Sequence, residues 1–463
     1  MTNQDPGADR SGARPIPPPA EAIPADPKAV DLRGDILVVG AGLVGMTMAI
    51  ALARAGADVV LVDRAPLDLQ QRPDFDGRAS AIAQANVRYL TSLGVWQRLP
   101  PTAPIREIRV SDGGSPFFLH YDSRALAGEL SGELSGELAG KPAGAPAAAE
   151  PLGRMVENRH LRLALAGTVA DLPGIRLIAP AQATALRPAQ AGGSHVDLDL
   201  ADGRRLRARL CVAADGRASA LRDMAGIDVQ GWSYPQAGIV CTVRHSLPHD
   251  GIAQERFLPS GPFAILPLTD AEDSGGDMAA ELPRHRASIV WTERQEAVPA
   301  IMALDDAAFA GEVARRFGDY LGPLRLEGPR WSYPLSFQLA RRLVAPRLAL
   351  IGDAAHNIHP IAGQGLNLGL RDIDRLAAEV AQPLRLGLDP GAPAVLQRYA
   401  AGRRFDTVLM GVVTDGLNRL FSNGDPGLRL LRGLGLSTVD RLPPLKRLLM
   451  RHAMGDLVLG LGR

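Results

Sequence analysis

The stretch Ile36–Ala53 reads ILVVGAGLVGMTMAIALA and decides the fold of this chain. An uncharged run of this length approaches that of a membrane span. Its three glycines instead favour a short strand, a tight turn and then a helix. A second apolar run, Val59–Val62, follows and ends at Asp63. Strand, helix and strand in this order form the βαβ unit of a parallel sheet, so we predict an α/β fold with a Rossmann-like domain.

The glycines of this stretch form a GxGxxG motif, Gly40-Ala41-Gly42-Leu43-Val44-Gly45. In such a motif Gly40 permits the tight turn, Gly42 lets a pyrophosphate approach the backbone, and Gly45 allows the helix to pack closely on the strand. The helix N-terminus favours negative phosphates. Asp63 follows the next strand, where a carboxylate can accept hydrogen bonds from ribose hydroxyls. The motif predicts a dinucleotide site but does not separate NAD from FAD.

Composition narrows the class of protein. The chain has 463 residues, too many for one compact core, and 46% of them are hydrophobic, as in globular proteins. Lys and Arg number 51 against 50 Asp and Glu, so no charge excess calls for nucleic acid. Cys211 and Cys241 form no CxxC pair and fit a reducing compartment. The N-terminus shows no secretory signal, and we expect a cytoplasmic protein.

Further along the chain, residues 126–150 contain the repeat GELSGELSGELAG and an Ala/Pro/Gly stretch, which we interpret as a surface insertion. Deletion of Glu129–Ala148 is expected to leave folding and cofactor content nearly unchanged. Residues 156–169 and 365–380 are expected to be helical. Residues 207–214 and 347–351 are expected to be strands. Residues 237–243, 262–268 and 287–292 are apolar and β-rich, which predicts an antiparallel sheet in a second unit.

Two later motifs carry a resemblance to a known family. They are Val212-Ala213-Ala214-Asp215-Gly216-Arg217 and Leu350-Ile351-Gly352-Asp353-Ala354-Ala355-His356. Both resemble fingerprints of the single-component flavin aromatic hydroxylases. The second continues through His359–Asp372, which is similar at every fixed position to HPxxGQGxNxGxxD, the signature of the FAD-dependent hydroxylases of ubiquinone biosynthesis. Segments around Asp76-Gly77-Arg78, Leu93–Trp96, Glu157–Arg159 and Thr414–Leu417 resemble the same family.

The resemblance implies FAD as cofactor and assigns further site residues. Arg78 and Arg159 would contact FAD, and Asp215 would lie near its pyrophosphate. The carboxylate of Asp353, after Gly352, can hold ribityl hydroxyls. The loop that feeds the next helix would face negative charge on a reduced flavin through its amides. The residues predicted for that loop are Pro360, Gly363, Gln364, Gly365, Leu366 and Asn367.

The activity implied by the family is that of an aromatic-ring monooxygenase. NAD(P)H or another electron donor reduces the FAD, O2 reacts, and one oxygen atom reaches an electron-rich ring while water is excluded. The expected substrate is a polyprenylated phenol of ubiquinone biosynthesis, which requires an apolar pocket; we expect this pocket under the 237–292 sheet, with Phe263 in its wall. No acid–base residue stands at a readable spacing, so no catalytic side chain is predicted. A relative that acts on another aromatic compound and a non-catalytic flavoprotein subunit of a biosynthetic complex stay open as alternatives.

Two features have competing interpretations. His356 and His359 are spaced like a metal pair, but no third ligand stands at a usual spacing, so we predict no metal site. Residues 434–463 mix leucines with Arg441, Lys446, Arg447 and Arg451. Such a segment fits docking on the inner face of a membrane or on a partner enzyme, and equally fits a helix packed on its own domain.

These observations divide the chain into seven predicted parts. A Rossmann-like FAD-binding domain is interrupted by an insertion and by an antiparallel β-sheet substrate domain, and a helical C-terminal region follows. In order the parts are a disordered tail (1–34), FAD-binding domain (35–125), low-complexity insertion (126–150), FAD-binding domain (151–230), substrate-binding sheet domain (231–339), FAD-binding domain (340–390) and C-terminal helical region (391–463).

Overall fold

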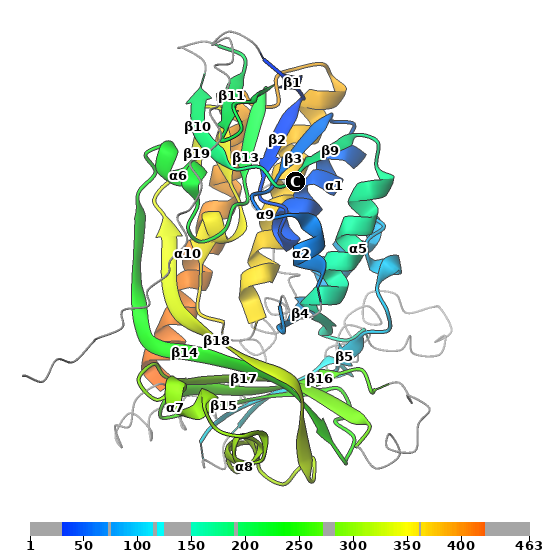
Figure 1. Ribbon diagram of the computed structural model, residues 1–463, viewed down its shortest axis with the longest axis vertical. Helices are drawn as coiled ribbons and strands as arrows, with labels where there is room; N and C mark the ends of the chain where they lie inside the picture. The colour runs from blue at the N-terminus through cyan, green and yellow to red at the C-terminus, as the bar shows by residue number, and fades with distance from the viewer. Residues whose placement is uncertain are drawn as a thin grey trace, which may run out of the picture.

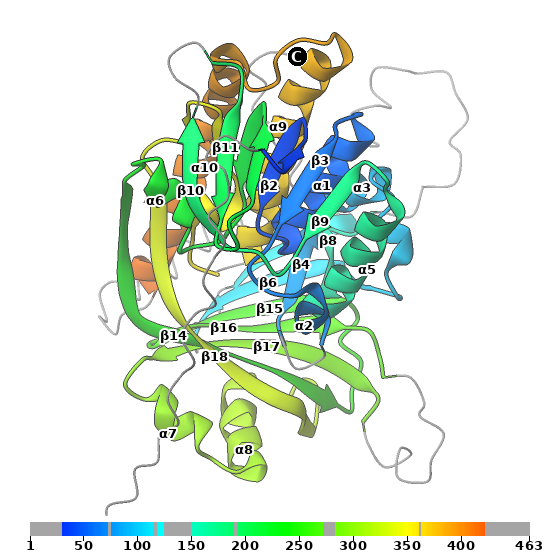
Figure 2. The same ribbon diagram turned by 45° about the horizontal axis from the view of Figure 1, so that its top comes forward.

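The structure is a computed structural model, and it describes residues 30–72, 76–113, 118–124, 150–188, 193–271, 283–360 and 363–421. The predicted insertion and the basic C-terminal segment lie outside the described residues, as does most of the predicted N-terminal tail. Figures 1 and 2 show two layers, a helix-covered parallel sheet above and a large curved sheet below.

The upper layer contains the predicted Rossmann-like unit. Its six-stranded sheet is parallel except for the edge strand β19. Across the sheet the strands are β19 (Val344–Ala345), β20 (Leu348–Leu350), β13 (Leu210–Ala213), β2 (Ile36–Val39), β3 (Val59–Val62) and β9 (Ile175–Ile178). Ile36–Ala53 therefore forms strand β2 and most of helix α1 (Leu43–Arg54), and the alternative of a membrane span is wrong.

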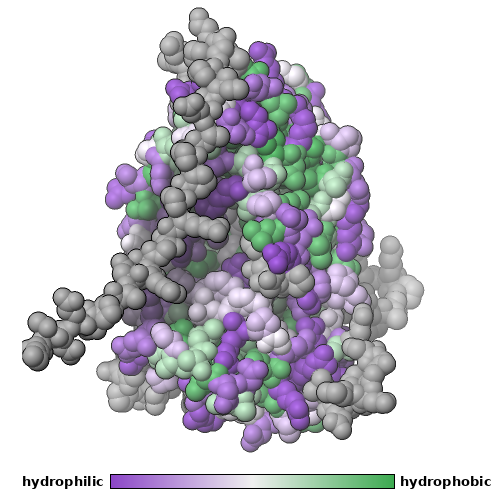
Figure 3. Space-filling view, in the orientation of Figure 1, coloured by the Kyte–Doolittle hydropathy of each residue, from purple (hydrophilic) through white to green (hydrophobic). Residues whose placement is uncertain are grey.

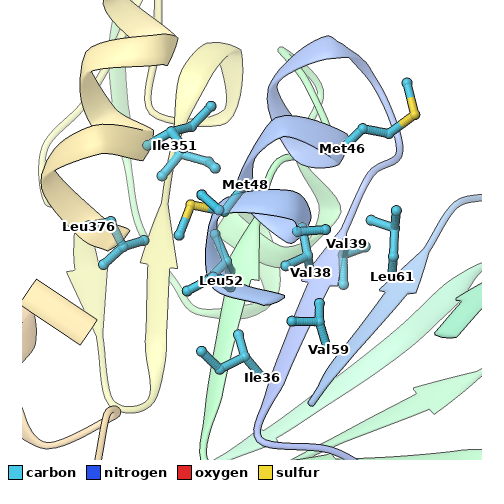
Figure 4. Packing of buried hydrophobic residues seen from close by; sticks show 14 of the residues in the cluster. Ile36, Val38, Val39, Met46, Met48, Leu52, Val59, Leu61, Ile351 and Leu376 are labelled. Carbon is cyan, nitrogen blue, oxygen red and sulfur yellow. The ribbon is translucent and has the colours of Figure 1, made fainter. Parts of the chain in front are cut away.

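Helices α1, α5 (Asn158–Asp171) and α9 (Gln364–Arg385) pack beside this sheet. Figure 4 shows how Met48 and Leu52 of α1 meet Ile36 and Val38 of the sheet and Leu376 of α9. All five side chains are essentially inaccessible to solvent. Because a parallel sheet is buried on both faces, its strands are continuous apolar runs, which is why they could be recognised in the sequence.

A four-stranded sheet packs on the same core through residues such as Leu198 and Leu206. Its strands are β1 (Leu32–Arg33), β12 (Arg205–Ala208), β11 (Val196–Leu200) and β10 (Ala183–Pro188). Two expectations differ from this arrangement. The predicted strand 207–214 is two strands, β12 and β13, in different sheets. Leu32 and Arg33 of the predicted tail pair in parallel with Leu206 and Arg207.

The lower layer is an eight-stranded sheet, antiparallel except for the parallel pair β15 and β6. Its strands are β21 (His356–Asn357), β18 (Leu324–Ala340), β14 (Val229–His245), β17 (His285–Arg294), β16 (Gly261–Leu268), β15 (Ile252–Leu258), β6 (Glu107–Asp112) and β7 (Phe118–Asp122). The predicted antiparallel strands thus lie side by side, in β14, β17 and β16. Strands β6 and β7 come from the segment assigned to the FAD-binding domain.

The two faces of this sheet have different partners. Ile239, Phe263 and Trp291 pack with Phe309 and Val313 of α8 (Asp306–Phe317) in one apolar cluster. Figure 1 shows α7 (Val298–Met302) and α8 below the sheet and the upper layer on its other side. The prediction that Phe263 lines a pocket beside the flavin is therefore wrong, because its fully buried ring faces the helices below.

Two further units pack against the large sheet. One is the three-stranded sheet β4–β8–β5, which packs on β16. The other is the long helix α10, which packs along α9 and beside β16 and β18. The bounds are β4 (Ala79–Ala83), β8 (Gly153–Glu157), β5 (Ala103–Ile105), α2 (Leu67–Gln71), α3 (Gln84–Ser92), α6 (Ala220–Met224) and α10 (Pro393–Phe421). On the face drawn in Figure 3, hydrophobic residues are interspersed with hydrophilic ones. No helix in the described ranges is long and apolar enough to cross a membrane.

Candidate functional site

The motif glycines in the turn between β2 and α1 have two different structural roles. Gly40 has φ +104°, and a Cβ there would lie 2.3 Å from the carbonyl oxygen of Ala214. A Cβ on Gly45 would lie 1.7 Å from the carbonyl oxygen of Gly40. A Cβ on Gly42, the N-cap of α1, would meet no protein atom within 4 Å. Gly40 and Gly45 are therefore required by the fold, whereas Gly42 opens onto free space at a helix N-terminus, where phosphates bind.

Asp63 ends β3 beside this turn. Its Oδ2 accepts a hydrogen bond from the Ala41 amide at 2.5 Å, and its Oδ1 accepts one from the Ala65 amide at 2.7 Å. The carboxylate thus fixes the glycine turn against the end of β3. Since a carboxylate has about four acceptor positions, it retains capacity for ribose hydroxyls, and that role stays a prediction.

Asp215 follows β13 and has one side-chain oxygen without a hydrogen-bond partner. Its Oδ2 accepts a hydrogen bond from the Leu221 amide at 3.2 Å, while its Oδ1 is buried without a hydrogen-bond partner. Burial raises the pKa of Asp215 above its usual value, despite hydrogen bonds from Ser219 and Leu221. A buried acceptor without a donor is costly, so this oxygen fits a site completed by a ligand.

Asp353 lies in the short 3-10 helix Gly352–Ala354, directly after β20. Its side chain is exposed, yet desolvation raises its pKa, and the charges of His356, Arg78 and Arg217 only partly oppose this shift. The carboxylate is therefore accessible to a ligand, and its charge is only partly compensated by the protein around it. A carboxylate placed in this way can accept hydrogen bonds from a polyhydroxylated chain.

Arg78 reaches the site from a buried ionic cluster. Its Nε and one terminal nitrogen donate to Asp76 at 2.8 and 2.9 Å, and Asp76 also accepts from Arg162 and Asn158. Burial alone would raise the pKa of Asp76, but the two guanidinium groups hold it well below its usual range. The guanidinium of Arg78 lies 5.0 Å from the centre of the Tyr333 ring. The cluster orients Arg78, whose side chain is still 49% exposed and available to a ligand.

Asp76, Arg162 and Asn158 were not among the predicted site residues. Asp76 belongs to the recognised Asp76–Arg78 segment, and Asn158 to the recognised Glu157–Arg159 segment, so the signal for both was present. Arg162, which donates to Asp76 at 2.9 Å, had no such signal. Its partner lies 86 residues away in the sequence, and only the fold brings the two together.

Arg159 has a different neighbourhood from Arg78. Its guanidinium donates twice to Glu157 Oε2, at 3.1 and 2.9 Å, and Glu157 Oε1 accepts from Arg286 of β17 at 2.7 Å. These ion pairs link α5 and β8 to the large sheet. Contact between Arg159 and FAD stays a prediction.

The predicted flavin loop leads into α9. Gly363 is the N-cap of α9 in the left-handed conformation, with φ +62°. A Cβ on Gly365 would meet no protein atom within 4 Å, and the first turn of α9 contains no acidic residue. Pro360 is exposed, and residues 363–366, which include Gln364 and Leu366, are half-buried. The helix therefore presents an open N-terminus suited to negative charge.

Asn367 differs from its neighbours because its side-chain amide makes all of its hydrogen bonds with other groups of the protein. Oδ1 accepts from the Ala83 amide and Asn86, and Nδ2 donates to the carbonyl oxygens of Ala81 and Gly363. These are all four hydrogen bonds that an Asn side chain can make. Asn367 thus fastens the start of α9 to β4 and α3, and its contribution to cofactor binding, which stays a prediction, would act through the position of the loop.

A buried ionic cluster centred on Asp372 lies next to the loop. Its Oδ2 accepts from the Gly352 amide at 2.9 Å and contacts Nε2 of His356 at 2.6 Å, and its Oδ1 accepts from Arg403 at 2.7 Å. Burial acts to raise the pKa of Asp372, but His356 and Arg403 outweigh it and lower the pKa to about 2. The sequence placed Asp372 in the signature but gave no signal for Arg403, which lies on α10.

His359 is buried directly before Pro360. Its ring is inaccessible to solvent, and neither ring nitrogen has a hydrogen-bond partner. Burial lowers its pKa to about 4, opposed only in part by Asp415. Its ring meets that of Tyr234 edge to face at 5.3 Å, and the Tyr234 hydroxyl donates to Asp415 at 2.7 Å. His356 and His359 therefore have separate partners, Asp372 and Tyr234.

Among the described residues, three potential metal ligands meet in one group, Glu107, His120 and Asp122. Glu107 already accepts from Arg109 and Arg124, each at 2.9 Å. Two guanidinium groups on one carboxylate neutralise the charge that a cation would need. We assign no metal to this group.

The upper face of the large sheet, on the side of the parallel sheet and its predicted cofactor site, carries different aromatic residues from the one predicted. Trp331 pairs with Val240 across the sheet, and a Cβ on Gly77 would lie 1.9 Å from its ring. Tyr333, two residues on, lies under Arg78. Trp331 and Tyr333 therefore lie beside the Asp76–Arg78 segment, in the place that the sequence analysis gave to Phe263.

Comparisons with known proteins agree with this geometry. The family model described as "FAD binding domain" matches residues 33–406. The chain is 47% identical over 444 residues to ubiquinone hydroxylase UbiL of Rhodospirillum rubrum, covering 96% of this chain and 94% of that protein. It is 33% identical over 432 residues to 3-demethoxyubiquinol 3-hydroxylase of Escherichia coli, covering 91% and 98%. The crystal structure of p-nitrophenol 4-monooxygenase from Pseudomonas putida has the same fold, with TM-score 0.68, 18% identity and coverage of 91% and 98%.

Proposed function

Because the chain belongs to the FAD-binding-domain family that includes the ubiquinone hydroxylases, we propose that it is an FAD-dependent monooxygenase acting on the aromatic ring of a polyprenylated phenol in ubiquinone biosynthesis. The observation that carries the cofactor assignment is the set of open and unsatisfied positions at Gly42, Asp215 and Asp353. They lie at the ends of β2, β13 and β20, which are neighbours in one parallel sheet. Ligands of such sheets bind at the carboxyl ends of the strands.

These residues fit FAD part by part. The amides around Gly42 would hold the pyrophosphate, Asp63 the ribose, and Asp353 the ribityl hydroxyls. The open N-terminus of α9 at Gly363 would stabilise negative charge on the flavin ring. When bound, FAD supplies the activation of O2 with electrons from NAD(P)H or another donor, chemistry that the side chains cannot provide.

The protein would place the phenol against the cofactor-side face of the large sheet. Trp331 and Tyr333 offer aromatic surfaces there, and Val240 and Val290 are apolar neighbours on that face. Such a lining excludes water, which protects the oxygenation step, and it suits a ring with an isoprenoid tail. We further propose that the protein works at the inner face of the membrane, where such substrates are dissolved, in the company of other enzymes of the pathway.

The test is product analysis with the purified holoprotein. A prenylated phenol, a soluble phenol lacking the tail, O2 and a donor system are supplied, and products are identified by mass spectrometry. A ring-hydroxylated prenylphenol is the expected product. Hydroxylation of the soluble phenol alone would instead support a related monooxygenase with another substrate. Absence of any substrate-dependent oxygen consumption would support the non-catalytic flavoprotein.

Quinone profiling in cells provides the second arm. A strain lacking this protein should accumulate a precursor one ring hydroxylation short of ubiquinone, and the wild-type chain should remove it. The Gly42→Val variant, expressed in the same strain and expected not to bind FAD, should leave the precursor in place. An unchanged quinone profile in the deletion strain would refute the proposed pathway.

A further inference from the structure

The outer side of α10 carries an apolar stripe, defined here as Phe405, Val408, Val412 and Leu420. Their exposed fractions are 62%, 43%, 64% and 41%. The spacings of three, four and eight residues put all four on one side of a helix, and the exposed Gly416 fills the gap between the last two. In Figures 1 and 2 α10 runs beside α9 and behind the bent ends of β14 and β18.

The opposite side of α10 is firmly attached to the protein. Met410 packs with Phe337 and Leu368 in an apolar cluster that adjoins the flavin loop. Asn418 donates to Gln236 of β14 at 3.1 Å. The helix is therefore held in place by its inner side, and the stripe is not needed for that attachment.

The acidic residues in this part of α10 do not belong to the stripe. From Phe405 to Phe421 the helix contains two acidic residues, Asp406 and Asp415. Asp406 accepts from Arg371 at 3.1 Å and from Arg403 at 2.6 Å, and Asp415 accepts from Tyr234 at 2.7 Å. Both carboxylates thus have partners on the inner side of the helix, while the neighbouring exposed Arg404 is basic.

The sequence that continues from α10 has the opposite charge to the rest of the chain. Residues 422–463 contain seven Lys or Arg and three Asp or Glu, a net charge of +4. The whole chain has a net charge of +1, so residues 1–421 sum to −3. The same 42 residues include twelve leucines. An apolar stripe without acidic residues is therefore followed in the sequence by a cationic, leucine-rich segment.

We infer that the stripe of α10 is the surface by which the protein docks on an anionic lipid bilayer. This inference rests on the proposed function, because a polyprenylated phenol resides in the membrane, and it names the surface that faces it. Apolar side chains enter the boundary between headgroups and acyl chains, and nearby Lys and Arg are attracted to anionic lipids. A docked α10 would bring the adjoining apolar cluster and the flavin loop next to the lipid.

A bilayer accounts for the stripe better than a second copy of the chain does. A stable protein–protein interface buries roughly 800 Å² on each partner, far more than one row of four side chains offers. Two copies joined through this surface would also bring two cationic segments together. A bilayer needs only shallow insertion and gains from the same positive charge.

The experiment is co-sedimentation of the full-length holoprotein with vesicles of phosphatidylcholine, with and without phosphatidylglycerol. Val412→Glu tests the stripe, because glutamate keeps the helix propensity but places a negative charge against the lipid. Leu386→Glu is the matched control: Leu386 ends α9 and is 63% exposed, against 64% for Val412. Retained FAD and an unchanged melting temperature show that each variant is folded.

We expect the wild-type protein and Leu386→Glu to bind the anionic vesicles, and Val412→Glu to bind them roughly tenfold more weakly. Phe405→Gln, also on the stripe, should weaken binding in the same direction and serves if Val412→Glu loses FAD. Equal binding by all variants, or no binding by the wild-type protein, overturns the inference. So does a wild-type dimer that Val412→Glu converts to a monomer without any vesicle binding. Vesicle binding is read without substrate turnover, so its failure is distinct from failure of the proposed hydroxylation.

Discussion

The two sides of the segment Gly352–Asp372 use carboxylates in opposite ways. On the side that we propose binds FAD, Asp353 is exposed and its pKa is raised, so its charge is poorly compensated by the protein. On the other side Asp372 is fully buried, bound by His356, Arg403 and the Gly352 amide, and its pKa is lowered to about 2. The fold thus compensates the charge of Asp372, which holds the loop, but not the charge of Asp353, for which we propose a ligand.

The glycine turn shows the same contrast between residues that the fold requires and residues that are open to a ligand. Substitutions in this turn have the largest expected effect, on FAD retention and on stability. Gly42→Val should abolish FAD retention while the apoprotein stays folded, because the side chain enters open space without meeting protein atoms. Gly45→Ala should instead destabilise the protein itself, since its Cβ would lie 1.7 Å from the Gly40 carbonyl oxygen. Flavin absorbance after gel filtration and thermal unfolding of the apoproteins separate the two outcomes. Normal FAD content in Gly42→Val would remove this turn from the site.

The ionic cluster gives the next largest effect, on stability. Asp372→Ala removes one of the two carboxylates that bind the buried Arg403, together with the acceptor for His356, and should cost about 3–5 kcal/mol of unfolding free energy. Denaturant unfolding of the FAD-free apoproteins measures this value, so that differences in FAD affinity do not contribute. Asp353→Ala is the matched control, because it removes a carboxylate whose charge the fold does not stabilise, and its unfolding free energy should change little. Equal losses in the two variants would show that the two sides do not differ.

The same contrast indicates what could be read from the sequence. Gly40–Gly45, the strands of the parallel sheet and the start of α9 were predictable because glycine spacing and apolar runs are local signals. The adjacency of β14, β16 and β17 was also predictable. The side of the sheet on which Phe263 lies was not, since alternation defines two faces without saying which one meets the cofactor.

Ion pairs between residues that are distant in sequence could not be predicted from the sequence either. Arg403 lies 31 residues from Asp372, and Arg162 lies 86 residues from Asp76. Both arginines stand among many others in an arginine-rich chain, so nothing local distinguishes them. Sequence motifs therefore predicted candidate ligand-binding residues, but they did not predict the buried arginines Arg403 and Arg162 that pair with Asp372 and Asp76.

The buried His359 gives a further test, the dependence of protein stability on pH. Its pKa is lowered from 6.5 to about 4 by burial, so between these values the unfolded chain binds a proton that the folded protein does not. Stability is therefore expected to be complete above pH 6.5 and to fall as the pH drops toward 4, by up to about 3 kcal/mol from this residue. His359→Phe keeps a ring against Tyr234 and should flatten this part of the profile. Denaturant unfolding at several pH values measures it, and an unchanged slope would contradict the assignment.

Asp353 gives the smallest effect and the most direct one on the cofactor. If its carboxylate accepts hydrogen bonds from FAD hydroxyls, Asp353→Ala should weaken FAD binding by about 1.5–3 kcal/mol, the usual value for a hydrogen bond to a charged group. Asp353→Asn keeps the shape and an acceptor oxygen but removes the charge, so its loss should be intermediate. Fluorescence titration of the apoprotein with FAD measures both. The charge already carries a desolvation cost, which raises its pKa, and the Asn variant removes that cost together with the charge. Its unfolding free energy should therefore equal or exceed that of the wild-type apoprotein. A loss of stability without a loss of FAD affinity would place Asp353 with the residues that hold the fold, on the same side as Asp372.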